Sequence, residues 1–413
     1  MGTVRNVAIA VLVISFLTFV AFFGRLPALR SLASVDMASY PGGFRRIDQK
    51  LTDGRLSAWI GRLASTLWND RHPLVMIFFF LLLFVSEYMF LPSAWSFLTT
   101  SRKIISGILV ILPYTFLWIS AASDPGYITP ANHSHKMTLY PYDFTVFYPG
   151  QACHTCHLLK PARSKHCSIC KHCISKMDHH CIFINNCVGR GNQHWFLLLL
   201  LTTAIVTTWG TYIGLSVLSD IVRTEIPAWN ALGRGFTWAQ YFHIWAWTLQ
   251  EKTRLGAATL LAFLTSPLVW GLLGYHIYLI WAGTTTNESM KWSDWQAEMS
   301  DGYVFRRSLP ENRQKDTNIE SPWTSWPVES QQIILRTEDG MPPRGPEAIG
   351  TGDWQRVWKL RDVENLYDLG FWDNLKDVFG LRYGVRPEQR AQHRLSADNG
   401  NTHTASRDSS GER

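Results

Sequence analysis

The chain has 413 residues, of which 46% are hydrophobic and 13% aromatic, and its 39 basic and 32 acidic residues give a formal net charge of +7. Five long runs carry most of the apolar residues, which excludes an ordinary water-soluble protein of two or three domains. The basic residues form no basic helix and no stripe interleaved with aromatic residues, so their pattern argues against nucleic acid as a partner. The net charge fits loops that lie beside an anionic lipid bilayer.

Each apolar run is near or above the length that crosses a hydrocarbon core of about 30 Å, which predicts an α-helical integral membrane protein with five transmembrane helices. The first run is either a cleavable signal peptide or a retained signal anchor. We expect an anchor, because no clear Ala-x-Ala site follows the run and Arg25 ends it. Glu87, near the end of the second run, is expected at the membrane interface. The runs are Val7–Phe23, Leu74–Phe90, Ile104–Ala122, Trp195–Leu218 and Leu255–Ala282.

Lysine and arginine counts in the loops predict the orientation of the spans. Residues 24–73 hold eight and residues 123–194 hold seven, whereas 91–103 hold two, 219–254 hold four and the N-terminal stub holds one. We therefore expect a lumenal N-terminus. The predicted order is a signal anchor at 1–24, a cytosolic segment at 25–73, helices two and three at 74–122, a cytosolic cysteine-rich zinc domain at 123–194, helices four and five at 195–282, a cytosolic C-terminal region at 283–386 and a disordered tail at 387–413.

The composition of the C-terminal region predicts little regular structure. Residues 305–360 are rich in Pro, Glu, Ser and Trp, and we expect them to be irregular. The tail beyond them is polar with few apolar residues, which is typical of disorder.

All seven cysteines fall in one predicted cytosolic loop, between Cys153 and Cys187. Paired Cys-x2-Cys spacings with nearby histidines are typical of zinc sites, whereas disulfide frameworks belong to small secreted domains. Two interleaved sets share the pattern Cys-x2-Cys-x9-His-x6-Cys, and the second set follows the first by fourteen residues. Cys3His is a closed ligand set for tetrahedral zinc, so we predict two structural zinc ions that order the loop. The first set is Cys153, Cys156, His166 and Cys173, and the second is Cys167, Cys170, His180 and Cys187.

One cysteine, Cys181, is left outside both sets. In an extended chain residues i and i+2 face the same way, so His179 and Cys181 would lie opposite the zinc ligand His180. His179 would then take the thiol proton, and Asp178 would orient the imidazole. The alternative is that Cys181 is a small buried residue that packs between the zinc sites. Three further histidines of the loop are expected at its surface: His154, His157 and His172.

The position of Cys181, fourteen residues before Trp195, places its thiol near the cytosolic edge of the fourth span. A thiolate there is well placed to attack a thioester whose acyl chain lies among the spans. Burial of the chain stabilises binding by about 0.8 kcal/mol per CH2, and that energy fixes the reacting carbonyl beside the thiolate.

The loop sequence CHTCHLLKPARSKHCSICKHCISKMDHHCIFINNCVGRGNQHWF resembles the cysteine-rich domain of the DHHC family of protein S-acyltransferases. Three other segments are similar to family motifs in family order. They are Asp124-Pro125-Gly126 after the third span, Thr285-Thr286-Asn287-Glu288 after the last span, and NLYDLGFWDNLKDVFG at 365–380, which contains Tyr367 and Asn374. The resemblance covers roughly 74–290 and 365–380.

The resemblance implies zinc ligation by the two sets, autoacylation of Cys181 from palmitoyl-CoA, and Asp178 with His179 as the activating pair. It also implies that Thr286, beside Thr285, approaches Asp178, and that Asn374 locks the C-terminal segment against the spans. The basic residues of the loop are candidates for the CoA phosphates, or else they form a solvated basic surface. They are Lys160, Arg163, Lys165 and Arg190.

Two departures from the family pattern point to one branch of it. Ile182-Phe183 replaces the usual Pro-Trp, and the usual four spans become five. Both features resemble a fungal branch in the endoplasmic reticulum that acylates SNAREs at membrane-proximal cysteines. The expected function is therefore protein S-palmitoylation. The competing hypothesis is a non-catalytic, zinc-stabilised membrane adaptor, which would need the zinc sites but not Cys181.

Overall fold

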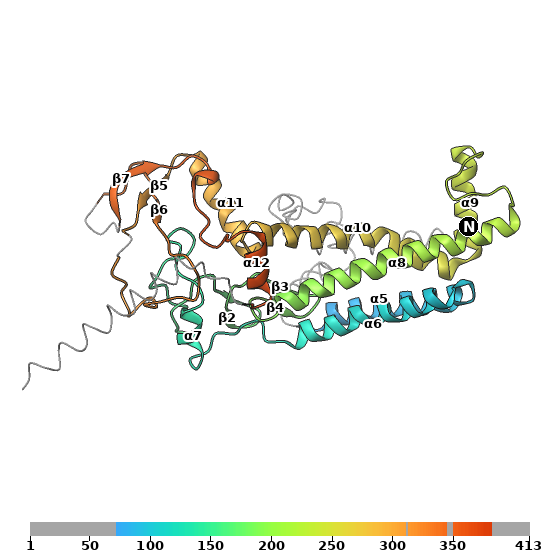
Figure 1. The fold of residues 1–413 in the computed structure, drawn as a ribbon, viewed down its shortest axis with the longest axis horizontal. Helices are drawn as coiled ribbons and strands as arrows, with labels where there is room; N and C mark the ends of the chain where they lie inside the picture. Colours follow the sequence, from blue (N-terminus) through green and yellow to red (C-terminus); the bar gives the residue numbers. More distant parts are fainter. Residues whose placement is uncertain (1–71, 311–312, 345–349, 382–413) are drawn as a thin grey trace, which may run out of the picture. The chain divides into compact units, whose positions relative to one another are not determined.

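The structure is a computed structural model of the chain, and it describes residues 72–310, 313–344 and 350–381 (Figure 1). The expected anchor at 1–24 and the expected tail at 387–413 lie outside the described residues. The chain divides into two compact units. The first comprises the described residues up to Gly126 together with Cys167–Leu279, and the second comprises Tyr127–His166 and the described residues from Ile280 onward.

Four described helices are long and apolar enough to cross a membrane. In such helices every backbone hydrogen bond is made within the segment, which a hydrocarbon environment requires. Their bounds lie within seven residues of the second to fifth apolar runs, which confirms a helical membrane protein. They are α5 (Leu74–Ala94, extended by the 3-10 helix η3, Trp95–Phe97), α6 (Thr100–Ala122), α8 (Gln193–Glu225) and α10 (Thr253–Trp281).

The spanning helices α6 and α8 run alongside each other (Figure 1), and polar bridges and small residues connect the spans. The indole Nε1 of Trp209 in α8 donates to Ser106 Oγ in α6 at 2.9 Å. Gly214 of α8 lies against α10, where an added Cβ would come within 2.1 Å of Thr259 Oγ1. Small residues permit this close approach of helix backbones in membranes.

The connection between the last two spans, counted above as a loop, contains the helix α9 (Trp238–Glu251). A capping box starts it: Thr237 Oγ1 accepts from Gln240 N at 3.3 Å, and Gln240 Oε1 accepts from Thr237 N at 2.9 Å. The Ser/Thr-x-x-Gln signal was therefore present in the sequence.

Two short β-hairpins carry six of the eight predicted metal ligands of the cysteine-rich loop. Strand β1 (Lys165–Cys167) pairs with β2 (His172–Ile174), and β3 (His179–Cys181) pairs with β4 (Asn186–Val188). The second pair is antiparallel, with His180 opposite Cys187.

The second unit corrects the expectation that 305–360 is irregular. Strands β5 (Val304–Ser308), β6 (Gln332–Arg336) and β7 (Thr351–Arg356) form an antiparallel sheet in the order β6-β5-β7. The strands are short, rich in arginine and far apart in sequence, so alternation of apolar residues did not show them. The apolar side of the sheet contributes to a cluster of Met299, Val304, Ile334 and Val357.

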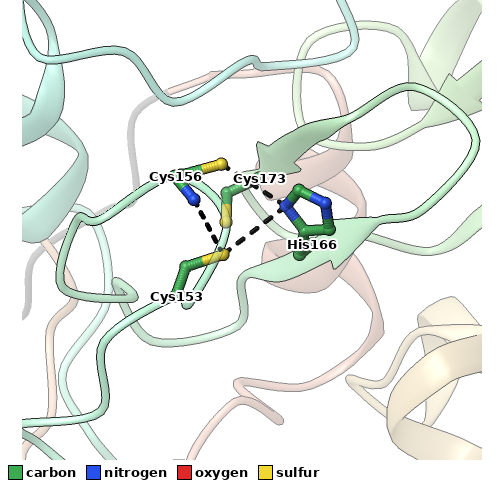
Figure 2. Close-up of side chains that lie close together, drawn as sticks. All are labelled: Cys153, Cys156, His166 and Cys173. Atoms are coloured by element: carbon green, nitrogen blue, oxygen red, sulfur yellow. Dashed lines mark hydrogen bonds between the residues drawn. The ribbon is translucent and has the colours of Figure 1, made fainter.

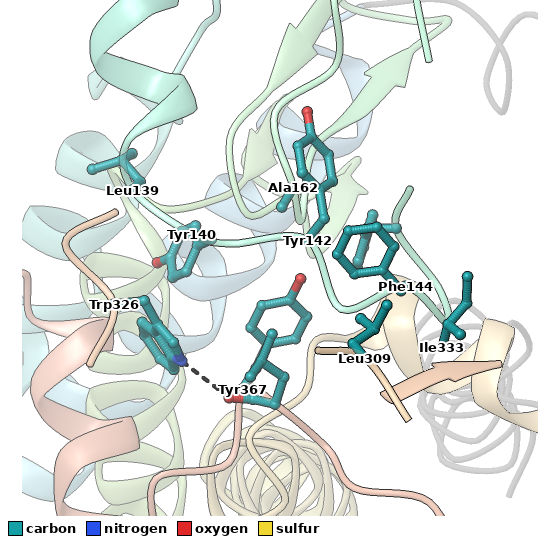
Figure 3. Packing of buried hydrophobic residues seen from close by; sticks show 11 residues of the cluster. Leu139, Tyr140, Tyr142, Phe144, Ala162, Leu309, Trp326, Ile333 and Tyr367 are labelled. Atoms are coloured by element: carbon teal, nitrogen blue, oxygen red, sulfur yellow. Dashed lines mark hydrogen bonds between the residues drawn. The ribbon is translucent and has the colours of Figure 1, made fainter. Parts of the chain in front are cut away.

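The other elements of the second unit are helices. They are α7 (His133–Met137), α11 (Thr286–Ser300), the 3-10 helix η4 (Leu360–Asp362) and α12 (Phe371–Val378). A buried aromatic cluster holds the segment 139–147 against the C-terminal region (Figure 3). In it the indole Nε1 of Trp326 donates to Leu366 O at 3.0 Å, and Tyr140 packs on Trp326 with ring centroids 5.2 Å apart.

Candidate active site and metal centres

The structure brings each predicted set of metal ligands together. In both groups one sulfur or nitrogen from every residue lies within 4.8 Å of the others. In the first group, shown in Figure 2, His166 Nδ1 lies 3.5 Å from Cys153 Sγ and 3.4 Å from Cys156 Sγ, with Cys173 beside them.

The second group is similar in size and buried. His180 Nδ1 lies 3.8, 3.4 and 3.6 Å from the sulfurs of Cys167, Cys170 and Cys187, and Cys170 Sγ lies 3.5 Å from Cys187 Sγ. Around tetrahedral zinc, with Zn–S and Zn–N bonds of about 2.3 and 2.0 Å, adjacent ligand atoms stand about 3.5 to 3.8 Å apart. The donor atoms therefore fit zinc in type and in spacing.

The β3–β4 hairpin separates the two histidines of the Asp-His-His-Cys sequence. His180 lies opposite Cys187 in the pairing register, and both belong to the second metal group. Since neighbouring residues of a strand face opposite sides, His179 and Cys181 share the other face. The three exposed histidines of the loop, His154, His157 and His172, are outside both groups.

Asp178, His179 and Cys181 form a connected set. His179 Nδ1 lies 2.9 Å from Asp178 Oδ2, and the imidazole also shares a hydrogen bond with the Cys181 side chain. Burial alone would lower the pKa of His179, but its hydrogen bonds and the charges of Asp178 and Cys181 outweigh burial and raise this pKa to about 10. An imidazole in this setting holds a proton readily beside a thiolate.

A second histidine, which was not among the expected site residues, also lies beside Asp178. His276, in α10, has Nδ1 3.7 Å from Asp178 Oδ2 and a ring centroid 5.7 Å from that of His179. Phe196 packs edge-on against both imidazoles, at 5.3 and 5.2 Å. An isolated histidine inside an apolar run was the available signal, because ionisable residues in spans are rare and mark functional sites.

Cys181 opens on a long apolar cavity between the spanning helices. Side chains of α5, α6, α8 and α10 line it, together with Phe183 and Ile184 of the hairpin turn. Phe183 packs edge-on against Phe79 of α5, with centroids 5.8 Å apart. The phenyl ring therefore supplies an apolar wall at the mouth of the cavity.

Hydrogen bonds tie the hairpin to the end of α6. Asn186 Nδ2 donates to the carbonyls of Ala121 and Ser123 at 3.2 and 2.9 Å, and its Oδ1 accepts from Cys187 N. The Asp-Pro-Gly segment continues this contact, since Pro125 O accepts from Gly191 N at 3.2 Å. A Cβ on Gly191 would lie 2.2 Å from Asp124 O, so this close approach requires glycine.

In the second unit, Arg163 does not face solvent. This corrects both alternatives expected for it, contact with the CoA phosphates and a place on a solvated basic surface. Its guanidinium is 2% exposed and forms a paired hydrogen bond with Glu288, Nε to Oε1 at 2.8 Å and Nη2 to Oε2 at 2.6 Å. It stacks on Tyr367 with 4.4 Å between the guanidinium carbon and the ring centroid. Lys165 donates to Asn287 at 2.8 Å.

Glu288 also starts α11. Its Oε2 accepts from Thr285 N at 2.9 Å, and Thr285 Oγ1 accepts from Glu288 N, which makes a capping box. Thr285 is fully buried, and Thr286 is the first residue of the helix. The approach of Thr286 to Asp178 stays a prediction.

The C-terminal motif residues bind backbone groups of the same unit. Asn374, in α12, donates to Ile280 O at 2.9 Å and accepts from Leu369 N. The Tyr367 hydroxyl donates to Pro141 O at 2.9 Å. Both side chains are buried.

Comparison with known proteins gives one consistent result. Residues 146–293 match the family model of the DHHC palmitoyltransferases. The chain is similar to palmitoyltransferase SWF1 of Neurospora crassa, at 52% identity over 410 residues that cover 95% of each chain. It is also similar to palmitoyltransferase swf1 of Emericella nidulans, at 41% over 414 residues (95% of this chain and 100% of the relative), and to mouse palmitoyltransferase ZDHHC4, at 34% over 203 residues (45% and 57%).

Proposed function

This chain belongs to the DHHC family of palmitoyltransferases and is a protein S-palmitoyltransferase, and we propose that Cys181 carries the acyl group from palmitoyl-CoA to the substrate protein. One observation carries the proposal. Of the seven cysteines, Cys181 alone is outside the two metal groups, and it shares a hydrogen bond with an imidazole that is bound to a buried carboxylate. An adaptor has no use for this arrangement.

In the first half-reaction His179 accepts the proton of the Cys181 thiol, and the thiolate attacks the thioester carbonyl carbon of palmitoyl-CoA. The carbonyl–sulfur bond to CoA breaks, and the CoA thiolate leaves with the proton from His179. The product is a thioester on Cys181. Asp178 fixes the orientation of the imidazole and stabilises its charged form.

The second half-reaction repeats these steps with a different thiol. His179 accepts the proton of a substrate cysteine, whose thiolate attacks the acyl carbonyl on Cys181. The acyl–sulfur bond to Cys181 breaks, and the proton returns to the Cys181 thiol. Both bonds are thioesters, so the reaction is close to balanced and the enzyme contributes mainly positioning and thiolate supply.

The cavity that Cys181 opens on favours a long acyl chain as the group that is transferred. Its lining residues come from all four described spans and are mostly apolar. Burial of each CH2 group stabilises the bound chain by about 0.8 kcal/mol. This energy is available to hold the carbonyl beside the thiol, since it comes from parts of the substrate that do not react.

The two Cys3His groups would hold structural zinc ions, which supply binding free energy for folding of the loop. His180 would bind the second ion through Nδ1. A fixed His180 sets the position of β3, and with it the face that carries His179 and Cys181.

The test is incubation of the purified full-length protein with labelled palmitoyl-CoA. We expect a hydroxylamine-labile label on the enzyme that disappears in Cys181→Ala while about two zinc ions per chain remain. Cys167→Ala should lose zinc and stability, and the exposed His154→Ala serves as the matched control that keeps both label and metal. Label that persists in Cys181→Ala refutes the acyl-enzyme.

His179→Ala distinguishes the two histidines. The variant should retain both zinc ions and acylate slowly. Loss of one zinc ion would show that His179, not His180, binds metal.

We further propose that the enzyme acts in the endoplasmic reticulum membrane, with the N-terminus in the lumen and the catalytic loop and C-terminal region in the cytosol, and that SNAREs are among its substrates. The support is the distribution of lysine and arginine in the loops and the resemblance of the sequence to a fungal branch of the family. Comparison of S-acylated proteins with and without the enzyme tests the substrates. Unchanged SNARE acylation would contradict this part of the proposal.

A further inference from the structure

One carboxyl group, that of Glu87, lines the apolar cavity between the spanning helices at Cys181. Glu87 is the single acidic or basic residue of the apolar span α5. The expectation that Glu87 lies at the membrane interface stays a prediction. The hydroxyl of Tyr114, in α6, donates to Glu87 Oε2 at 2.5 Å.

The other oxygen of this carboxyl differs from every other polar group of the lining. The lining hydroxyls of Ser86, Thr203, Thr207 and Thr265 donate to backbone carbonyls of their own helices, and Ser106 accepts from Trp209. Among the described residues that line the cavity, Glu87 Oε1 is the buried side-chain oxygen without a hydrogen-bond partner. A buried oxygen left in this state is costly, and a bound group that pairs with it gains that free energy back.

The position of Glu87 along α5 gives its depth. Phe79 contacts Phe183 at the mouth of the cavity, and Glu87 follows Phe79 by eight residues. At 1.5 Å per residue the carboxyl lies about 12 Å deeper than Phe79. An acyl chain attached to Cys181 and extended into the cavity therefore passes Glu87 with its middle carbons.

We propose that Glu87, held by Tyr114, is a specificity-determining residue that makes this cavity accept fatty acyl-CoA with a hydroxyl group on the middle of the chain. A hydroxyl both donates and accepts, so it pairs with Oε1 whether the carboxyl is charged or neutral. A saturated acyl chain at the same depth covers Glu87 Oε1 but offers it no hydrogen bond. This inference rests on the proposed acyl-Cys181 intermediate and names a further class of acyl donor for it.

The test uses the full-length protein and a series of hydroxypalmitoyl-CoA isomers in which the hydroxyl moves along the chain. The measurement is kcat/KM for acylation of Cys181 relative to palmitoyl-CoA. The wild type should show a maximum for mid-chain isomers, about fivefold above the isomers at either end. Glu87→Leu should remove the maximum and raise the use of palmitoyl-CoA. Ser93→Ala is the matched control, because Ser93 is on the same helix, donates to Met89 O and does not line the cavity.

Palmitoyl-CoA itself separates the possible failures. If the wild type takes no label from palmitoyl-CoA, the acyl-Cys181 proposal is wrong. If it takes label but all isomers react equally, the role of Glu87 is wrong and the acyl-enzyme stands. Should Glu87→Leu fail to fold, Tyr114→Phe replaces it. That variant frees Glu87 Oε2 and should broaden the isomer maximum, and an unchanged profile overturns the proposal.

Discussion

Replacement of Glu288 by glutamine tests the buried ion pair that connects the loop 127–166 with the start of α11. Both side chains of the pair with Arg163 are 2% exposed, and two hydrogen bonds of 2.8 and 2.6 Å join them. The substitution removes the negative charge but keeps an oxygen that can accept from Thr285 N. The cap of α11 is therefore retained, and the change isolates the charge.

The size of the expected loss of stability depends on the partners that Arg163 retains in the variant. Removing one partner of a buried pair costs about 3 to 5 kcal/mol, because the remaining charge is uncompensated. Here Asp377 is 4.0 Å from Nη1 of Arg163, and Gly283 O accepts from Nη2 at 3.0 Å, so the lower end, about 3 kcal/mol, is expected. For a unit of this size that corresponds to a fall in Tm on the order of 5 to 10 °C.

The assay is thermal unfolding of the detergent-solubilised protein, followed by tryptophan fluorescence. Arg163→Met should destabilise by a similar amount, since it leaves the carboxylate buried. The double variant Arg163→Met, Glu288→Met should be more stable than either single variant, because no uncompensated charge remains. A double variant whose loss equals the sum of the single losses would refute this account.

Three further predictions concern the catalytic hairpin. Asn186→Ala leaves the carbonyls at the end of α6 and the amide of Cys187 without their partner, and should lower the free energy of unfolding by about 1 to 3 kcal/mol; unchanged thermal stability would contradict the role of these bonds. Gly191→Ala forces a Cβ against Asp124 O and should cost about 1 to 3 kcal/mol, whereas Gly107→Ala, with open space around it, should not destabilise. His276→Asn should lower kcat for Cys181 acylation by about 10- to 100-fold through misplacement of the Asp178–His179 pair, with KM for palmitoyl-CoA and zinc content unchanged. A change in KM alone would mean that His276 acts on donor binding.

The parts of the molecule that follow from local pattern were predictable from the sequence. Apolar runs located the four described spans because hydrocarbon burial requires long uninterrupted helices. The fourteen-residue repeat located both ligand groups because ligand spacing is a property of short segments. The prediction that His180 faces the metal group and His179 faces Cys181 followed from the alternation of side chains along a strand.

The parts that depend on distant partners were not predictable. Arg163 meets Glu288, 125 residues later, and His276 meets Asp178 from another helix. No periodic pattern in a single sequence connects two residues that are so far apart in the chain. Strands β5 and β6 were missed for the same reason, since Val304 pairs with Arg336 across a long connection.

The turn between β3 and β4 determines which kinds of mutation the hairpin tolerates. Cys181 pairs with Asn186, so four residues, 182–185, close the hairpin, with Asn185 in the left-handed conformation at φ 49°. Replacement of side chains in this turn leaves the pairing intact, and Ile182-Phe183 in place of Pro-Trp is such a change. Insertion or deletion of a single residue instead shifts one strand by one position and turns every side chain on it to the opposite face. Constraint at this turn therefore falls on its length more than on its composition.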